Sequence, residues 1–181
     1  MINKLPIIGV MGSAKDAHPE KAEPLGHWIA KSGFHLLTGG GAGVMQAVSK
    51  AFCGIKNRKG ISIGIIPGYV QDNKYFSLPG YPNPWIEIPI YTHLPLSGPD
   101  GLLAQSRNHI NILSAHIVVA LAGSHGTASE VKLAIKYNKP VLGYINSLSE
   151  IPGLTEHIPF YPKLADLTKA IENIFLSKSY N

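Results

Sequence analysis

The sequence predicts an α/β protein with an open, mainly parallel sheet and helices on both faces. Short runs rich in Val and Ile recur along the chain, and such runs are typical of strands buried on both sides. Segments with apolar residues at helical spacing separate these runs. Because strands that alternate with helices form parallel sheets, the two observations together predict this fold class.

Length and composition indicate a globular protein. The chain has 181 residues, of which 45% are apolar and 15% charged, so we expect one ligand-binding domain over residues 1–181. A single cysteine, Cys53, excludes an internal disulfide and suits a reducing cytoplasm. The apolar run 5–11 is too short for a signal peptide, and no run reaches the roughly 20 residues of a membrane span. We therefore expect a soluble, cytoplasmic protein without membrane association.

The net charge of +5 has two interpretations. It is compatible with an anionic ligand or with nucleic acid as a partner. The basic residues are scattered, however, and Lys56, Arg58 and Lys59 form their only cluster. Composition alone therefore does not predict nucleic-acid binding.

The first third of the chain alternates strands with helices. The apolar run 6–11 predicts a buried strand, and 19–32 predicts a helix with apolar residues on one face. A second strand at 34–38 leads into the turn Gly39-Gly40-Gly41-Ala42-Gly43. A second amphipathic helix is predicted at 44–52.

The middle of the chain contains two predicted loops. A third strand at 61–66 is stopped by Pro and Gly. Residues 69–84 are rich in Pro, Gly, Asn and Tyr and predict a long surface loop. Residues 85–90 alternate as an extended element, and 91–99 predict another loop.

The last part continues the same alternation. A helix is predicted at 101–115, and the most apolar strand follows at 116–122. A further helix starts at Ala128, and a buried strand is predicted at 140–145. The chain then ends in an amphipathic helix, whose apolar side comprises Leu164, Leu167, Ile171, Ile174 and Phe175. Since no linker or repeat divides the chain, we expect one Rossmann-like domain.

Three turns of small residues predict an anion site. The turns 39–43 and 123–127 each follow a predicted strand and open a helix, where free backbone N–H groups and the helix dipole attract anions. Gly12-Ser13 is a third such turn. One glycine turn alone could serve only close helix packing. The carboxyl ends of parallel strands share one edge, however, so three such turns indicate a ligand crevice.

Two common phosphate sites and a metal site are not indicated. The turn at 39–43 has neither the GxGxxG spacing of a dinucleotide site nor the Lys-Ser/Thr of a P-loop. No acidic residue follows the second predicted strand to bind an adenine ribose. The eight histidines show no metal-ligand spacing.

Two motifs carry a resemblance to a known family. Thr38-Gly-Gly-Gly-Ala-Gly-Val-Met-Gln46 resembles the GGGxxGLM turn of the LOG-like superfamily, and Ala122-Gly-Ser-His-Gly-Thr-Ala-Ser-Glu130 resembles its PGGxGTxxE motif. In the LOG phosphoribohydrolases an Arg fifteen positions before the second motif pairs with its last Glu. Arg107 and Glu130 occupy those positions here. The resemblance covers nearly the whole chain.

Several departures point to one branch of this superfamily. The glycine turn is one residue shorter than in LOG enzymes. Ala122 and Ser124 replace the expected Pro and Gly, and Ser129 stands where LOG enzymes often carry another Glu. The sequence thereby looks more like the molybdenum cofactor carrier proteins. That resemblance implies a homodimer or homotetramer, molybdopterin as the bound ligand and molybdoenzymes as its recipients.

Two hypotheses of function follow from the resemblance. In the first, the protein is a non-catalytic carrier that binds, protects and transfers molybdenum cofactor, with the phosphate in the glycine turns and the pterin under the loops 68–84 and 92–99. The residues expected to bind it are Gly12, Ser13, Gly39, Gly40, Gly41, Gly43, Arg107, Asn108, Gly123, Ser124, His125, Gly126, Thr127 and Glu130. In the second, Arg107 and Glu130 are the catalytic residues of a phosphoribohydrolase that acts on purine riboside 5′-monophosphates.

Several of these residues also have structural explanations. Arg107 could support its helix by a salt bridge to Glu130, which is predicted in the first turn of the following helix, where the dipole favours a carboxylate. Ser124 and Thr127 could be helix caps. Tyr81 is expected in packing or at an oligomer face. These alternatives stay open at the level of sequence.

Overall fold

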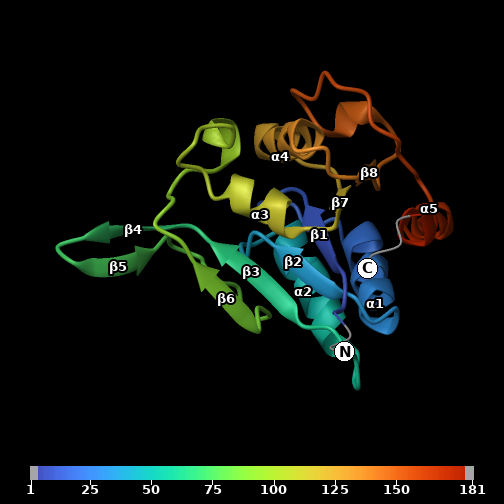
Figure 1. Cartoon of the computed structure of the whole chain (residues 1–181), viewed down its shortest axis with the longest axis horizontal. Helices are drawn as coiled ribbons and strands as arrows, with labels where there is room; N and C mark the ends of the chain where they lie inside the picture. The colour runs from blue at the N-terminus through green and yellow to red at the C-terminus, as the bar shows by residue number, and fades with distance from the viewer. Residues whose placement is uncertain (1–3, 178–181) are drawn as a thin grey trace.

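A computed structural model describes residues 4–177 and has a six-stranded sheet at its centre (Figure 1). The strand order is β6-β3-β2-β1-β7-β8, and every neighbouring pair is parallel. The predicted α/β, Rossmann-like architecture is thereby confirmed. The strands of this sheet are β1 (Ile7–Met11), β2 (His35–Thr38), β3 (Ser62–Ile66), β6 (Ile88–Tyr91), β7 (Ile117–Ala120) and β8 (Val141–Gly143).

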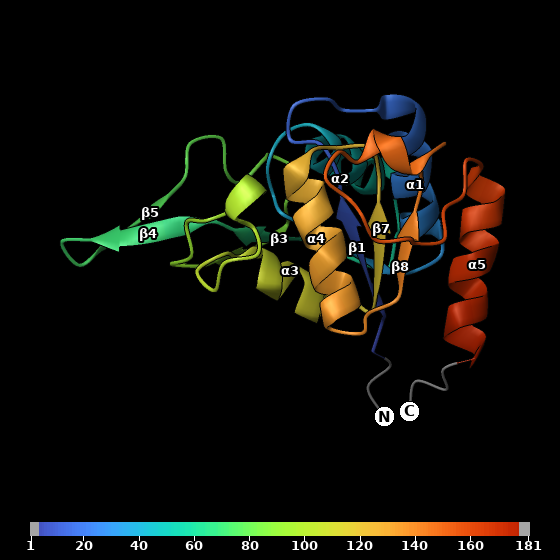
Figure 2. The same cartoon turned by 90° about the horizontal axis from the view of Figure 1, so that it is seen from above.

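Helices cover both faces of the sheet, and each face has its own hydrophobic core (Figures 1 and 2). One face is covered by α1 (Pro19–Lys31), α2 (Val44–Gly54) and α5 (Leu164–Ser177). The other is covered by α3 (Asn108–Ser114) and α4 (His125–Lys136). None of the helices within residues 4–177 is long and apolar enough to cross a membrane.

The strand order reverses at β1, which pairs with β2 on one side and β7 on the other. In open α/β sheets such a reversal leaves a crevice outside the carboxyl ends of the strands. The three small-residue turns predicted from the sequence follow β1, β2 and β7. They therefore meet at this crevice.

The loop predicted at 69–84 is partly a hairpin, formed by β4 (Gly68–Gln71) and β5 (Lys74–Ser77). Asp72 and Asn73 both have positive φ angles, of 49° and 58°, which is the geometry of a tight two-residue hairpin turn. This turn signal was missed because the high Pro, Gly and Asn content of the segment suggested irregular structure. The hairpin projects from the body of the protein (Figure 2).

The helix predicted at 101–115 begins only at Asn108. A short 3-10 helix (Gly98–Asp100) and successive turns precede it. This segment packs against α4, where Ser129 Oγ lies 3.3 Å from the carbonyl oxygen of Gly98. The segment is thus shaped by contact with α4 rather than by its own helical preference.

Helix α4 begins at His125 rather than at Ala128, since the backbone N–H of Ala128 already donates to the carbonyl of Ser124 at 3.0 Å. Glu130 therefore lies in the second turn, and the first turn has no acidic residue. The dipole at the helix N-terminus does not account for Glu130, because that effect fades beyond the first turn. The predicted placement of Glu130 in the first turn is wrong.

Candidate functional site

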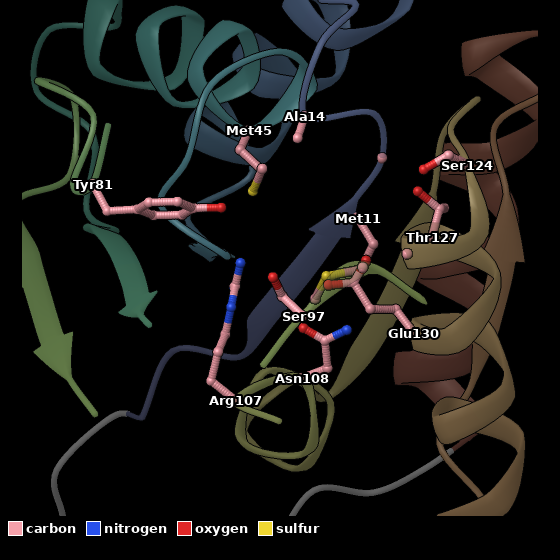
Figure 3. Close-up of a pocket in the computed structure, with 13 residues that line it drawn as sticks. Met11, Ala14, Met45, Tyr81, Ser97, Arg107, Asn108, Ser124, Thr127 and Glu130 are labelled. Atoms are coloured by element: carbon pink, nitrogen blue, oxygen red, sulfur yellow. The ribbon is translucent and has the colours of Figure 1, made fainter. Parts of the chain in front are cut away.

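A cleft of about 120 Å³ lies at the carboxyl ends of β1, β2 and β7 (Figure 3). The turn after β1, the first turn of α2 and the start of α3 form part of its wall. The remaining wall comes from the N-terminus of α4 and from two loops that contribute Tyr81, Ser97 and Gly98. The cleft therefore occupies the position that the strand reversal predicts.

Backbone contacts tie the turns around the cleft together. The N–H of Ser13 donates to the carbonyl of Ala122 at 3.0 Å, and the N–H of Val44 donates to the carbonyl of Ser13 at 2.9 Å. Gly43 has a φ of 62° and lies so close to this strand end that a Cβ would be 2.7 Å from the carbonyl carbon of Ala14. The turns after β1, β2 and β7 thus form one rigid rim.

Arg107 is the cation of the cleft. It immediately precedes α3 and is only 3% exposed, yet its Nε and Nη1 make no hydrogen bond to any residue in the range 4–177. Its guanidinium lies 5.7 Å from the centre of the Tyr81 ring and extends toward that ring in Figure 3. Burying an unpaired charge is costly, so this arrangement indicates a site for an anionic group.

Gly39 provides the space that Arg107 occupies. A Cβ on Gly39 would lie 2.6 Å from the Cζ of Arg107 and would overlap its Nη1. Gly39 itself does not line the cleft. Its lack of a side chain therefore leaves room for the arginine.

Glu130 faces the cleft from α4 and is 8% exposed. Its Oε1 accepts a hydrogen bond from Asn111 Nδ2 at 3.4 Å, but no cation among the described residues comes within 4 Å of it. Within the described residues Glu130 therefore forms no salt bridge with Arg107, one of the two alternatives left open by the sequence, because the guanidinium is directed toward Gly39 and Tyr81 instead. Burial raises the pKa of Glu130 to about 7, against the opposing effects of Arg107 and Asn111.

Asn108, which follows Arg107 in the sequence, adds a hydrogen-bond acceptor that has no partner among the described residues. Its side chain is 2% exposed, and Nδ2 donates to Ser129 Oγ at 3.4 Å, whereas Oδ1 has no partner within residues 4–177. Ser129 Oγ in turn donates to the carbonyl of Gly126 at 2.7 Å. The cleft thus offers charged N–H donors from Arg107 and a fixed carbonyl acceptor from Asn108, a pairing suited to a ligand with an anionic group and an N–H group.

The N-terminus of α4 provides the other anion-binding element. Ser124 precedes the helix, and Ser124, Gly126 and Thr127 line the cleft. The first backbone N–H groups of a helix have no acceptor within it, and Ser124 makes no side-chain cap. These N–H groups and the helix dipole together attract a phosphate or carboxylate.

The structure brings together only part of the set of residues predicted to bind the ligand. Those that line the cleft are Gly12, Arg107, Asn108, Ser124, Gly126, Thr127 and Glu130. Ser13 and Gly123 line an adjoining cavity, while His125 is exposed and its ring lies over Gly153. The residues behind the wall, which line neither cavity, are Gly39, Gly40, Gly41 and Gly43.

Met11, Met45 and Tyr81 also line the cleft, although the sequence motifs do not predict them as site residues. Met11 and Met45 have the apolar character of core residues, so nothing in the pattern distinguishes them. Tyr81 is brought in by its neighbour Asn83, whose N–H and Nδ2 both donate at 2.8 Å, to the carbonyls of Gly40 and Gly41. The loop is therefore fastened to the glycine turn.

Replacing Glu130 by Gln is expected to stabilise the protein above pH 7 and to change little near pH 4.5. Between these values the folded protein keeps a proton on Glu130 that the unfolded chain has lost, so the free energy of unfolding falls as pH rises. The full effect is about 3 kcal/mol. Urea unfolding of both proteins across this range measures it, with exposed Glu23→Gln as a control. A stabilisation that does not grow with pH would contradict the burial argument.

Sequence comparisons relate the chain to known proteins. The sequence model of the SLOG cluster4 family matches residues 5–159. An uncharacterized protein from Archaeoglobus fulgidus is 30% identical over 140 residues, which is 76% of this chain and 79% of that protein.

Two solved structures resemble nearly the whole chain. The molybdenum cofactor binding protein from the phototrophic bacterium Rippkaea orientalis is 32% identical, with a TM-score of 0.72 over 96% of this chain and 99% of that one. A molybdenum cofactor carrier protein from Chlamydomonas reinhardtii is 31% identical, with a TM-score of 0.71 over 97% and 100% of the two chains.

Proposed function

The chain belongs to the SLOG cluster4 family, and we propose that it binds, protects and transfers molybdenum cofactor. The observation that carries this proposal is the buried, unpaired guanidinium of Arg107 in the cleft beside the N-terminus of α4. The solved structures described above support it, because they are molybdenum cofactor binding and carrier proteins. Molybdenum cofactor is the cargo in this proposal, not a group that takes part in catalysis.

Different groups in the cleft contact different parts of the ligand. Arg107 and the first N–H groups of α4 bind the terminal phosphate of the pterin. Asn108 Oδ1 accepts a hydrogen bond from the N–H groups on the pterin ring, which gives the buried acceptor its missing partner. The glycine turn after β2 acts from behind the wall by making room for Arg107.

Glu130 couples binding to pH. A neutral carboxyl leaves Arg107 as the only full charge among the residues that line the cleft, so the local potential is positive. An ionised Glu130 would repel an anionic ligand. Affinity for the phosphate is therefore highest below pH 7.

The proposal includes partners of two kinds. The protein acts in the cytoplasm as a homodimer or homotetramer and delivers its cargo to molybdoenzymes. Exposed apolar side chains on β4, β5 and β6, which include Val70 and Ile88, are compatible with contacts between copies.

A second candidate function is the cleavage of purine riboside 5′-monophosphates. One observation favours it: a buried carboxyl in the cleft with a pKa of about 7 can act as a general acid or base. The separation of Arg107 from Glu130 favours the carrier, because the hydrolase hypothesis depends on their pairing. Incubation with AMP, followed by an assay for adenine and ribose 5-phosphate, discriminates the two, and the carrier proposal predicts no turnover.

Protection and transfer are tested with loaded protein. Molybdenum cofactor bound to the protein should survive exposure to air longer than free cofactor, because the pterin is shielded from oxygen. Loaded protein should then activate a molybdoenzyme prepared without cofactor, as measured by the activity of that enzyme. Equal decay of bound and free cofactor would contradict protection, and a recipient that stays inactive although free cofactor activates it would contradict transfer.

A further inference from the structure

A second hollow lies near the amino ends of β1, β2 and β3, at the opposite end of the strands from the cleft. It is formed by the end of α1, by the segment 55–59 after α2 and by Leu5, and its cavity volume is about 390 Å³. Four of its ten lining residues are basic and none is acidic. We call it the basic hollow, and its cations are Lys31, Lys56, Arg58 and Lys59.

Arg58 holds the segment 55–59 in place. Its guanidinium forms an ion pair with Glu87, and Nη1 donates to the carbonyls of Cys53 at 3.5 Å and Ile55 at 3.4 Å. The guanidinium also lies 5.1 Å from the centre of the Phe52 ring. Arg58 is thus neutralised and turned inward, which leaves Lys56 and Lys59 exposed on a fixed support.

The two sides of the basic hollow are brought together at Gly33. This glycine has a φ of 77° and follows the last turn of α1, which carries Lys31. The aliphatic part of Lys59 lies over it, because a Cβ on Gly33 would be 3.9 Å from Lys59 Cδ. Lys59 therefore lies beside the helix end that holds Lys31.

Three lysines of the basic hollow are free for a partner. The side chains of Lys31, Lys56 and Lys59 make no hydrogen bond or ion pair with any residue in the range 4–177. The carboxyl ends of α1 and α2 lie nearby, and each contributes about half a negative charge. Three full positive charges exceed that sum, so the basic hollow keeps a positive potential.

Apolar side chains lie between these cations. Leu5 and Ile55 both line the basic hollow and are half-buried. An apolar floor with a charged rim is the usual composition of a protein docking surface. The lysines are exposed single charges on flexible stems rather than a buried fork, which favours steering of an acidic surface over tight capture of a small anion.

We propose that the basic hollow is a docking surface for an acidic segment of a partner protein. Carboxylates of this segment contact Lys31, Lys56 and Lys59, and an apolar side chain between them contacts Leu5 and Ile55. The basic hollow lies at the amino ends of the strands and the cleft at their carboxyl ends, so a docked partner leaves the cleft accessible. The proposal is independent of which ligand the cleft binds.

The test uses a fluorescent peptide of alternating Glu and Leu and measures anisotropy at low salt. The wild-type protein should bind it, with an affinity that falls as NaCl is added. Lys56→Glu combined with Lys59→Glu should weaken binding by about tenfold or more. Lys31→Glu alone should weaken it by a smaller factor. Lys74→Glu combined with Lys163→Glu changes the net charge equally at exposed sites outside the basic hollow and should leave binding within about twofold of the wild type.

Three results would overturn the proposal. Equal loss in the control pair would mean that only net charge matters. Equal binding of a peptide with Lys in place of Glu would exclude charge recognition. Displacement of the acidic peptide by pyrophosphate at lower concentrations than by unlabelled peptide would identify a small-anion site instead.

Discussion

Arg107→Ala is expected to weaken binding of molybdenum cofactor by about a hundredfold or more. The guanidinium is buried and supplies at least two N–H groups that have no partner within residues 4–177. Charge-assisted hydrogen bonds in such a desolvated place contribute about 2–5 kcal/mol when one partner is removed. The measurement is equilibrium titration of the cofactor, followed by pterin fluorescence.

The same substitution should not destabilise the ligand-free protein. Removing a buried charge without a partner relieves a desolvation cost, so the free energy of unfolding of Arg107→Ala should equal or exceed that of the wild type. Lys74→Ala is the control, because it removes one positive charge from the exposed hairpin. If Arg107→Ala bound cofactor as tightly as Lys74→Ala, the assignment of the cleft would be wrong.

Gly39→Ala is expected to weaken binding by about tenfold or more without replacing any residue that lines the cleft. The added methyl group would overlap the guanidinium of Arg107, which must move away from its seat. Gly54→Ala is the matched control, because a Cβ there meets nothing within 4 Å. Binding is measured by the same titration, with urea unfolding to show that both variants fold.

The pair of Gly39 and Arg107 also allows a double-mutant test. If Gly39 acts only by positioning Arg107, then Gly39→Ala should cause no further loss in a protein that already carries Arg107→Ala. Losses that add fully in the double variant would contradict this role. They would indicate that the backbone at Gly39 contacts the ligand itself.

The fold could be predicted because its signals are local. Buried strands such as 117–120 are continuous apolar runs, and the helices carry apolar residues at a period near 3.6. The start of α3 could not be predicted from local sequence, because the segment before it packs against Ser129 on α4. The Asp72-Asn73 hairpin turn was within reach of sequence reasoning, since both residues tolerate positive φ.

The motifs single out several residues that the structure places around one cleft. Arg107 and Glu130, which the resemblance to the LOG-like superfamily singles out, both line the cleft, and so does Asn108. The motifs did not predict which residues these side chains contact, because the direction of a side chain depends on neighbours that are distant in sequence. Gly39 makes space for Arg107 on one side of the cleft, whereas Asn111 on α3 contacts Glu130 on the other.

The central claim is that the cleft binds molybdenum cofactor through Arg107, and retention of the cofactor tests it most directly. Purified protein is mixed with freshly released cofactor and passed through gel filtration, and pterin is assayed in the protein peak with and without AMP as competitor. We predict close to one pterin per chain for the wild type and almost none for Arg107→Ala. Absence of pterin from the wild-type peak, or its displacement by AMP at concentrations comparable to that of the cofactor, would contradict the claim.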